Sequence, residues 1–317
     1  MTGHASRLRI VFFGSGAFAI PSFEALLDAD HSVTALVTQP DREKGRGRAL
    51  HPPPLKPVAE ARGVPVLQPR RIKEAAAQEA VRGFAPELSV VVAYGQILPR
   101  SVLDMAPLGA INVHASLLPR YRGAAPIQWA LANGESRTGV TTMLLDEGLD
   151  TGPILLQRAT PIGPDETASD LEPRLARLGA ELLLETLVGL RDGTLSPTPQ
   201  DPAAATLAPI LRKQDARLDW TEPAEALAHR VRGLHPWPGT VTEWQGRPLK
   251  VLRARTTDPA PGFEPGAVIG VELEGVRVAC GADSALRLVE VQPESRRPMS
   301  AHDWAMGARL PQGARLG

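Results

Sequence analysis

The 317-residue sequence contains one cysteine, few aromatic residues, no excess of either charge and no long apolar run. The single cysteine, Cys280, excludes an intramolecular disulfide and a thiolate cluster for zinc. The 35 basic residues balance the 35 acidic ones, which argues against indiscriminate binding to polyanions. No apolar run has the length of a membrane-spanning helix, and no signal-peptide pattern precedes the first strand. We therefore expect a soluble, cytoplasmic protein.

The length and the pattern of the first 194 residues predict a Rossmann-like domain. A chain of 317 residues can bury two separate cores, so two domains are expected. Between residues 1 and 194, runs rich in Val, Ile and Leu (at 9–14, 88–95 and 111–116) alternate with helical patterns. Near-continuous apolar strands separated by helices are typical of a largely parallel sheet with helices on both faces. The predicted fold class is therefore α/β.

The pattern changes at residue 195. Residues 195–209 are rich in Pro and Ala and have no periodicity, which favours an interdomain linker. One helical pattern and about five short strands then follow at close spacing. Short strands at such spacing are typical of a small β-barrel. Residues 210–317 are therefore predicted to form a barrel of the oligonucleotide-binding type.

Two loops near the N-terminus have sequences that suit phosphate binding. The turn GSGAF follows the first predicted strand, but Ala19 stands where a dinucleotide-binding motif has its third glycine, so an ordinary tight turn is favoured. The loop at 39–57 is longer than the usual roughly two to six residues. Four of its cations alternate with acidic and glycine residues, and these are Arg42, Lys44, Arg46 and Arg48. These cations could contact phosphates, or the loop could simply be solvated and flexible.

Asn112 and His114 are the first polar side chains in the apolar strand INVHAS. Residues two apart in a strand point to the same side, so the amide and the imidazole are presented together. An amide N–H can stabilise an oxyanion and a histidine can transfer a proton, but a hydrogen-bonded pair within the core would have the same spacing. Asp146 and Asp150 lie in the loop of LLDEGLDTGPILL. A carboxylate in that loop could approach the imidazole and fix its tautomer.

The segments N-V-H-A-S-L-L-P-R-Y-R-G-A-A-P-I-Q and D-E-G-L-D-T-G-P-I-L resemble the signature of formyltransferases that use 10-formyltetrahydrofolate. Further matching segments occur in the family's order, namely FFGSGAFAIPSFEALL, TQPDREKGRGRAL, VVVAYGQILP, RLDW and HPWPGTV. The resemblance runs from about residue 7 to near residue 305. Two short segments depart from the family's pattern: the GSG turn, where Gly-Thr-Pro is common, and PPPLK, where Pro-Val-Lys is common.

This resemblance implies an activity and roles for particular residues. The implied reaction transfers a formyl group from 10-formyltetrahydrofolate to the α-amino group of methionine on initiator methionyl-tRNA, for translation initiation in a bacterial cytoplasm. Asn112, His114 and Asp150 match the family's catalytic positions. The folate-binding segments match Ser116, Leu117, Leu118, Pro119, Tyr94, Gly95 and Ile97. The loop with Arg42, Lys44, Arg46 and Arg48 matches a tRNA-binding insertion, and the C-terminal barrel matches a domain that contacts tRNA.

The resemblance implies neither a metal nor a nicotinamide, and a monomer is expected. The same chemistry could act on another amine, that of a sugar nucleotide or of glycinamide ribonucleotide, so the acceptor stays open. A hydrolase of the formyl-folate is a further alternative, against which the predicted C-terminal barrel argues. A noncatalytic RNA-binding module is another, against which the zero net charge and the complete Asn, His and Asp set argue.

Overall fold

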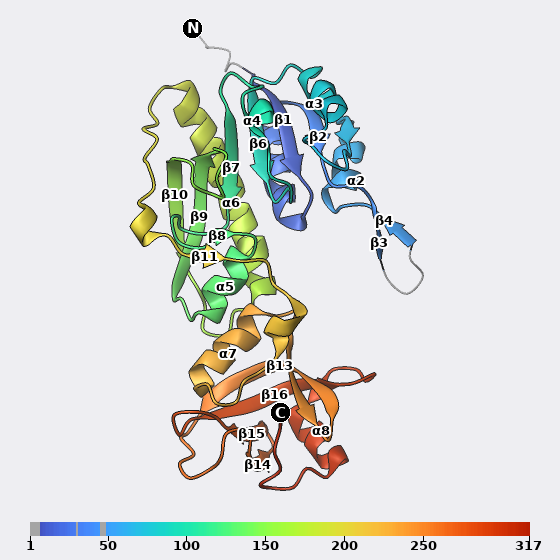
Figure 1. The fold of residues 1–317 in the computed structure, drawn as a ribbon, viewed down its shortest axis with the longest axis vertical. Helices are drawn as coiled ribbons and strands as arrows, with labels where there is room; N and C mark the ends of the chain where they lie inside the picture. The colour runs from blue at the N-terminus through green and yellow to red at the C-terminus, as the bar shows by residue number, and fades with distance from the viewer. Residues whose placement is uncertain (1–6, 30, 45–48) are drawn as a thin grey trace. The chain divides into compact units, whose positions relative to one another are not determined.

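The chain forms two units in a computed structural model that describes residues 7–29, 31–44 and 49–317 (Figure 1). The first unit comprises Met1–Ala124, Thr138–Thr160 and Glu172–Ala208, and the second comprises Ala125–Arg137, Pro161–Leu171 and Pro209–Gly317. Two short segments from the N-terminal part of the chain thus belong with the C-terminal strands. The units therefore do not divide the chain at a single linker.

A seven-stranded sheet forms the centre of the first unit. Its order is β10 (Ile154–Pro161), β9 (Arg137–Leu144), β7 (Ala110–His114), β6 (Leu88–Val92), β1 (Arg9–Gly14), β2 (Ser32–Val37) and β5 (Val66–Leu67). The strands from β7 to β5 are parallel, and β9 is antiparallel to β7. All of β6 and β7 is buried, as the continuous apolar runs require for a sheet covered on both faces. The prediction of a mainly parallel α/β sheet is confirmed.

The strand order reverses beside β1. β2 and β5 lie on one side of β1, whereas β6 and β7 lie on its other side. In open α/β sheets, ligands bind at the carboxyl ends of the strands beside such a reversal. The loops that follow β1, β2, β6 and β7 therefore surround the place where a ligand is expected.

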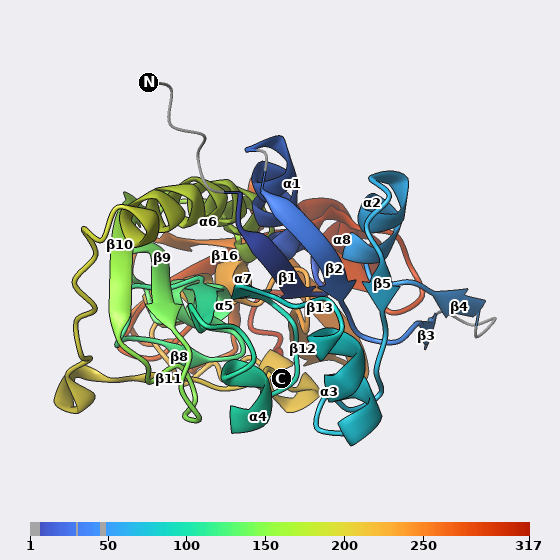
Figure 2. The same ribbon diagram turned by 90° about the horizontal axis from the view of Figure 1, so that it is seen from above.

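Helices cover both faces of this sheet. They are α1 (Ile20–Asp28), α2 (Leu55–Ala61), α3 (Ala75–Arg82), α4 (Arg100–Leu103) and α6 (Ala168–Arg191). The 3-10 turns of this unit are η1 (Ala17–Ala19) and η2 (Pro202–Ala204), and η2 is exposed. Phe12 of β1 packs edge-to-face on Phe23 of α1, with ring centroids 5.3 Å apart. The next residue, Phe13, points to the other face and joins a cluster that includes Val81 of α3 and Val102 of α4. Figure 2 shows α1 and α6 on one side of the strands and α3 and α4 on the other.

An antiparallel sheet forms the centre of the second unit. The strands of this sheet are β12 (Thr240–Trp244), β13 (Arg247–Thr257), β14 (Val268–Glu272), β15 (Gly275–Ala279), β16 (Ala285–Pro293) and β17 (Met299–Ser300). The helices of the unit are α5 (Pro126–Ala132), the 3-10 helix η3 (Lys213–Ala216), α7 (Ala224–Gly233) and α8 (Ala301–Ala308). The strand order is β12-β13-β16-β15-β14, with β17 beside β16. Trp220 and Leu227 belong to the core cluster of this unit. The sheet fits the predicted class, and its closure into a barrel stays a prediction.

The helix α5 belongs to the second unit because it packs closely on α7. A Cβ on Gly233 would lie 2.6 Å from the main-chain nitrogen of Ala132, so only glycine permits this approach. In addition, the indole N–H of Trp129 donates to the carbonyl of Pro209 at 2.8 Å. Glycine at one position of α7 thus fixes a piece of the N-terminal sequence in this unit.

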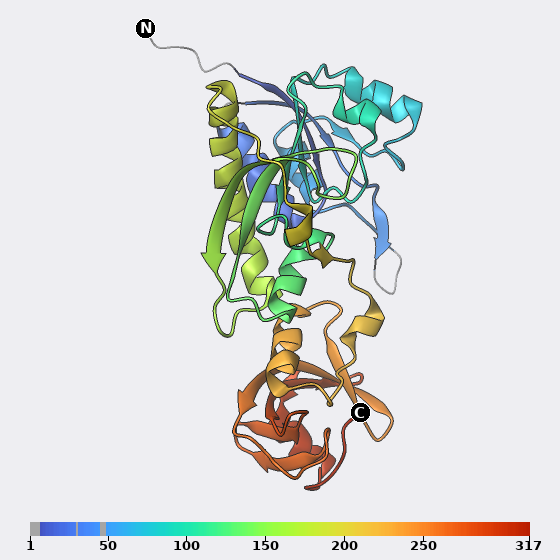
Figure 3. The same cartoon turned by 60° about the vertical axis from the view of Figure 1, so that its left-hand side comes forward.

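The segment 195–208, predicted as part of a linker, is hydrogen-bonded along the first unit (yellow to gold in Figure 3). Thr198 and Ile154 exchange two main-chain hydrogen bonds of 2.8 Å. The hydroxyl of Thr206 accepts the main-chain N–H of Tyr121 at 2.8 Å. Residues Leu207–Ala208 form β11, which pairs with β8 (Arg122–Gly123). Main-chain pairing of this kind leaves no side-chain periodicity, which is why composition alone indicated a linker.

In the part of the chain that the structure describes, no helix has both the length and the apolar character needed to cross a membrane.

Candidate active site

Asn112 and His114 point to the face of the sheet that carries α3 and α4. Val113, between them, packs on the opposite face, where a Cβ on Gly179 of α6 would come within 2.9 Å of its Cγ1. Because successive strand residues alternate, the amide and the imidazole share the other face. Their side chains are nearly buried, with Asn112 9% and His114 6% exposed. The strand geometry thus presents both groups together beside the carboxyl end of β6, as the spacing predicts.

The two ring nitrogens of His114 have different surroundings. Nε2 lies 2.9 Å from the carbonyl oxygen of Tyr121. A carbonyl can only accept, so we assign the proton to Nε2, which donates this hydrogen bond. Nδ1 faces Asp150, 3.7 Å from its Oδ2. That distance is too long for a hydrogen bond, and the two groups form an ion pair only when His114 is protonated, so Nδ1 is the ring nitrogen available to a reacting group.

Asp150 is held by the main chain of β8. Its Oδ2 accepts the N–H of Gly123 at 2.8 Å, and its own backbone is left-handed, with φ of 53°. Gly123 has φ of 126°, and a Cβ there would lie 2.5 Å from the carbonyl oxygen of Ala208. A glycine is therefore required where the carboxylate is anchored. The loop strain and the anchor together fix one carboxylate oxygen beside His114.

Asn112 differs from its two neighbours because its amide is uncommitted. No hydrogen bond joins its side chain to any residue that the structure describes. Amides as buried as this one are usually hydrogen-bonded within the protein. The Asn112 amide is therefore free to bind an atom of a ligand.

Gln200 holds the Asp150 loop, a role that no pattern in the sequence predicts. Its amide nitrogen donates to the carbonyls of Asp150 and Gly152, each at 2.8 Å. Its Oε1 accepts from Arg122 Nε at 3.0 Å and from the same guanidinium's Nη2 at 2.7 Å. All four residues of this network lie in the first unit. Nothing in the Pro- and Ala-rich segment around Gln200 marks it as functional, because its partners are main-chain carbonyls far along the chain.

Ser116, Leu117, Leu118 and Pro119, predicted to bind folate, form the turn after β7. Ser116 is fully buried, and its hydroxyl donates to the carbonyl of Arg120 at 2.6 Å. Leu118 is also buried; its N–H donates to Thr141 Oγ1 at 3.1 Å and its carbonyl accepts from Gln157 at 2.8 Å. Leu117 and Pro119 are partly exposed. Ser116 and Leu118 thus shape the turn, and any ligand contact falls to their exposed neighbours.

Tyr94, Gly95 and Ile97 form the loop after β6, and their side chains have different roles. The Tyr94 ring is buried against Phe13, with centroids 5.5 Å apart, and burial raises the pKa of its hydroxyl. Gly95 has φ of 83°, and the side chain of Ile97 is 77% exposed. Within the described residues, the N–H groups of 95–97 make no hydrogen bond. This loop therefore offers unpaired main-chain donors beside an exposed apolar side chain, while Tyr94 belongs to the core.

The turn after β1 is cross-braced rather than open. The hydroxyl of Ser15 accepts the N–H of Gln39 at 3.0 Å and lies 3.3 Å from the carbonyl of Tyr94, to which it donates. The side chain of Gln39 also donates to that carbonyl, at 3.1 Å. This turn ties together the carboxyl ends of β1, β2 and β6. The interpretation of GSGAF as an ordinary tight turn agrees with this bracing.

The cationic loop begins in a small hairpin of β3 (Arg42–Lys44) and β4 (Ala49–His51). Arg42 is exposed and donates to Gln39 Oε1 at 3.1 Å. Hydrogen bonds from Gln68 and Lys56 anchor Asp41 at the base of the hairpin and lower the pKa of its carboxyl group. Of the other predicted tRNA-binding residues, Lys44 is placed only by its backbone in β3, and Arg46 and Arg48 lie outside the described residues. The hairpin thus presents at least one cation on a fixed base.

Within residues 7–29, 31–44 and 49–317, no three or more His, Cys, Asp or Glu side chains gather in a way that could hold a metal ion.

Comparison with known families gives two matches. The formyl transferase model matches residues 8–187, and the model of the formyl transferase C-terminal domain matches residues 210–309. The methionyl-tRNA formyltransferase of Solibacter usitatus is 51% identical over 310 residues, which cover 98% of this chain and 99% of the relative. That of Anaeromyxobacter dehalogenans is 53% identical over 304 residues, which cover 95% of this chain and 97% of the relative.

Solved structures share the fold at low sequence identity. An N-formyltransferase from Helicobacter canadensis, in complex with folinic acid and dTDP-3-aminofucose, aligns with a TM-score of 0.66 at 17% identity, covering 90% of this chain and 99% of that one. HypX from Aquifex aeolicus, in complex with tetrahydrofolic acid, aligns with a TM-score of 0.63 at 18% identity, covering 95% of this chain and 47% of that one. The fold of this chain is thus shared with both of these proteins.

Proposed function

The chain belongs to the formyl transferase family, and from this premise we propose that it transfers a formyl group from 10-formyltetrahydrofolate to the α-amino group of methionine on initiator methionyl-tRNA. The product serves the initiation of translation. Relatives with the name methionyl-tRNA formyltransferase match almost the whole chain at about half identity, which favours this acceptor over a sugar-nucleotide amine. The fold shared with sugar N-formyltransferases carries no such weight at 17% identity.

The observation that carries the proposed chemistry is the set of Asn112, His114 and Asp150. One group is uncommitted, one ring nitrogen is available, and one carboxylate is anchored 3.7 Å from that nitrogen. Such a set can stabilise charge and move a proton without a side-chain nucleophile. Direct attack by a substrate amine on a formyl carbon needs charge stabilisation and proton transfer, and it needs no covalent enzyme intermediate.

In the proposed reaction, the methionine nitrogen bonds to the formyl carbon, and the bond from that carbon to N10 of the folate breaks. The carbonyl oxygen gains negative charge in the tetrahedral intermediate. The N–H of Asn112 and protonated His114 are assigned to this oxygen. Removing one such donor typically raises the barrier by roughly 3–4 kcal/mol.

The proton lost by the attacking nitrogen ends on N10 of the departing folate. A free α-amino group titrates near pH 8 (about 7.7–8.0), so part of it must lose a proton before it can attack. Asp150 holds a negative charge beside Nδ1 of His114 and helps to pass the proton between the two amines. Tyr121 fixes the ring by accepting from Nε2, so the proton exchanges at Nδ1.

The folate co-substrate is proposed to bind between the turn of Ser116 to Pro119 and the loop of Tyr94 to Ile97. Both segments follow neighbouring parallel strands, so they lie at one edge of the sheet. The unpaired N–H groups of 95–97 can meet the acceptor atoms of a pterin edge, and Ile97 can cover its apolar surface. The residues present therefore fit a flat ring with polar edges.

The tRNA is proposed to contact both parts of the sequence. Arg42, Lys44, Arg46 and Arg48 supply cations for phosphates near the acceptor end, because guanidinium and ammonium groups pair with phosphate oxygens. Residues 1–194 are assigned to catalysis, 195–209 to the connection, and 210–317 to tRNA binding. We further propose that the protein acts as a cytoplasmic monomer in bacteria.

A formylation assay tests the proposed function. The protein is incubated with 10-formyltetrahydrofolate and, separately, with methionyl initiator tRNA, glycinamide ribonucleotide or a sugar-nucleotide amine. Formyl transfer to methionyl-tRNA is the expected result. Faster transfer to either of the other amines would contradict the acceptor and leave the chemistry of the site standing.

A further inference from the structure

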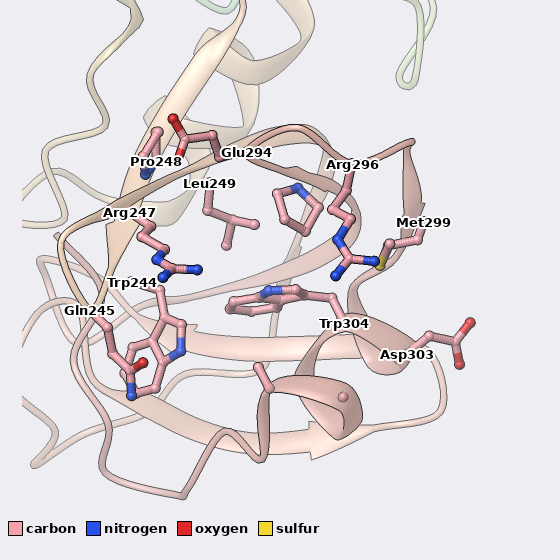
Figure 4. Close-up of a pocket in the computed structure, with 13 residues that line it drawn as sticks. Trp244, Gln245, Arg247, Pro248, Leu249, Glu294, Arg296, Met299, Asp303 and Trp304 are labelled. Carbon is pink, nitrogen blue, oxygen red and sulfur yellow. The ribbon is translucent and has the colours of Figure 1, made fainter.

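The second unit contains a surface pocket that the catalytic proposal does not use (Figure 4). The hairpin of β12 and β13 forms one wall, and the end of β16, β17 and α8 form the others. Its volume is about 660 Å³, which falls within the range of roughly 300–1,000 Å³ typical of small-ligand sites. We call it the C-terminal pocket.

The walls of this pocket carry two tryptophans and two arginines whose donors are unpaired. In the described part of the chain, no hydrogen bond or ion pair engages the indole N–H of Trp244 or Trp304, or the guanidinium of Arg247 or Arg296. By contrast, Trp220 of the same unit donates to Thr242 at 3.0 Å. Unpaired donors gathered in one hollow are suited to a ligand rich in acceptor atoms.

The hairpin turn explains why an aromatic ring and a cation meet here. Gln245 and Gly246 have φ of 51° and 73°, the conformation of a tight two-residue hairpin turn. This turn sets Trp244 directly opposite Arg247 in the ladder of β12 and β13. Side chains directly opposite one another in a ladder lie on the same face of the hairpin, so the turn places Trp244 and Arg247 side by side in the wall of the pocket.

The cationic side chains of the pocket point inward, whereas its carboxylates point outward (Figure 4). Figure 4 shows the guanidinium groups of Arg247 and Arg296 reaching inward toward the indole of Trp304, which is 8% exposed. The carboxylates of Glu294 and Asp303 point away from the pocket. The interior is therefore positive although the lining residues balance in number, and a ligand inside it meets cations and indole surface.

We propose that the C-terminal pocket binds a single unpaired nucleotide of an RNA strand, with the base against the indole of Trp244 and the phosphate between Arg247 and Arg296. Bases stack on aromatic side chains, and guanidinium groups pair with phosphate oxygens. Naming the tRNA substrate as the source of this nucleotide rests on the proposed function. A free nucleotide has the same chemistry, and an acidic peptide would share only the negative charge.

Binding of deacylated initiator tRNA to the full chain, measured at several salt concentrations, tests the charged half of the pocket. Arg296→Ala is expected to weaken binding several-fold and to reduce the salt slope by about one contact, which is roughly 0.7–0.9. Arg297→Ala is the matched control, because this exposed arginine is adjacent in sequence and does not line the pocket. Equal losses in the two variants would mean unspecific attraction and would overturn the proposal.

The aromatic half is tested with Trp244→Leu and Trp244→Phe, after circular dichroism shows that each variant is folded. Trp244→Leu is expected to weaken tRNA binding about tenfold, since stacking on an aromatic ring is lost, and Trp244→Phe is expected to retain most of the affinity. Equal affinity in the two variants would contradict stacking.

Two further probes separate the possible ligands. Adenosine monophosphate is expected to bind far more weakly than tRNA; equal affinity would assign the pocket to free nucleotides and overturn the RNA proposal. Polyglutamate binding that falls in Trp244→Leu as strongly as tRNA binding does would favour an acidic protein partner instead. Because deacylated tRNA needs no catalysis, a protein that binds it through the pocket but transfers no formyl group would fail only the proposed function. A protein that formylates without using the pocket would fail only this inference.

Discussion

His114 and Asp150 of the candidate active site are tied to the protein, whereas Arg247 and Arg296 of the C-terminal pocket are not. His114 and Asp150 each have a main-chain partner, and Gln200 fixes the loop behind them. Arg247 and Arg296 have no partner in the described part of the chain. Catalysis gains from groups held in place before the substrate arrives, because nothing then has to reorganise in the transition state.

The difference suggests two kinds of recognition in one chain. An anchored carboxylate suits a reaction in which charge develops at one atom. Long arginine side chains with unpaired ends suit a polyanion, whose phosphates can be met in several geometries. Asn112 lies between these cases, since it is nearly buried like the anchored groups but has no described partner. In the proposed mechanism, it is the group left for the substrate within a site whose other side chains are anchored.

The largest effect is expected from His114→Ala, which removes the central group of the anchored site. Formyl transfer should fall by roughly 10²–10⁴-fold, because proton transfer and charge stabilisation are lost together. Single-turnover formylation of methionyl-tRNA measures this loss, and circular dichroism checks the fold. Near-normal turnover in a folded variant would remove His114 from the mechanism.

Gln200→Ala tests whether anchoring of the loop matters as much as the catalytic groups themselves. Loss of the two contacts to the carbonyls of Asp150 and Gly152 should lower kcat roughly 10- to 100-fold by misplacing the carboxylate. Gln200→Glu should lose a similar amount, because its carboxylate keeps the contact with Arg122 but repels the two carbonyls. The KM for the folate should stay unchanged in both variants.

The control for this prediction is Gln312→Ala, which changes the same side chain at an exposed position of the second unit. Its kcat should match that of the unchanged protein. A loss of thermal stability in Gln200→Ala with normal kcat would mean that Gln200 supports the fold and not the geometry of Asp150.

Arg42→Ala tests whether an exposed cation of the first unit binds tRNA in the way proposed for the arginines of the C-terminal pocket. We expect a several-fold rise in the KM for methionyl-tRNA, a smaller salt dependence, and unchanged folate binding, because one phosphate contact is lost. Steady-state kinetics with each substrate varied in turn measure the split. Arg177→Ala, on the exposed side of α6, serves as the matched control. An equal loss of folate affinity in Arg42→Ala would contradict a role confined to tRNA.

The smallest effect on activity is expected from alkylation of Cys280. Burial raises the pKa of the Cys280 thiol to about 12, so at pH 8 the folded protein holds it as the unreactive thiol and not the thiolate. Iodoacetamide should therefore leave formyl transfer unchanged and label the cysteine only after unfolding, as mass spectrometry can show. Rapid labelling of the active protein would mean that this part of the second unit opens readily.

The fold class could be predicted from the sequence because the patterns that indicate it are local. Near-continuous Val, Ile and Leu runs between helical patterns indicated a parallel sheet, and β6 and β7 are indeed buried along their whole length. The spacing of Asn112 and His114 likewise placed them on one face, since alternation in a strand is a local property. The segment 195–208 gave no such signal, because main-chain pairing holds it on the first unit.

The sequence by itself determined the α/β class and the C-terminal strands, because composition and periodicity are local properties of neighbouring residues. It predicted the set of Asn112, His114 and Asp150 through motifs that resemble those of a known family. Only the tertiary structure decided which nitrogen of His114 is available, that Gln200 holds the Asp150 loop, and that Trp244 and Trp304 share one pocket. Each of these depends on contacts between residues far apart in the chain, and the geometry of such contacts follows from packing rather than from any local pattern.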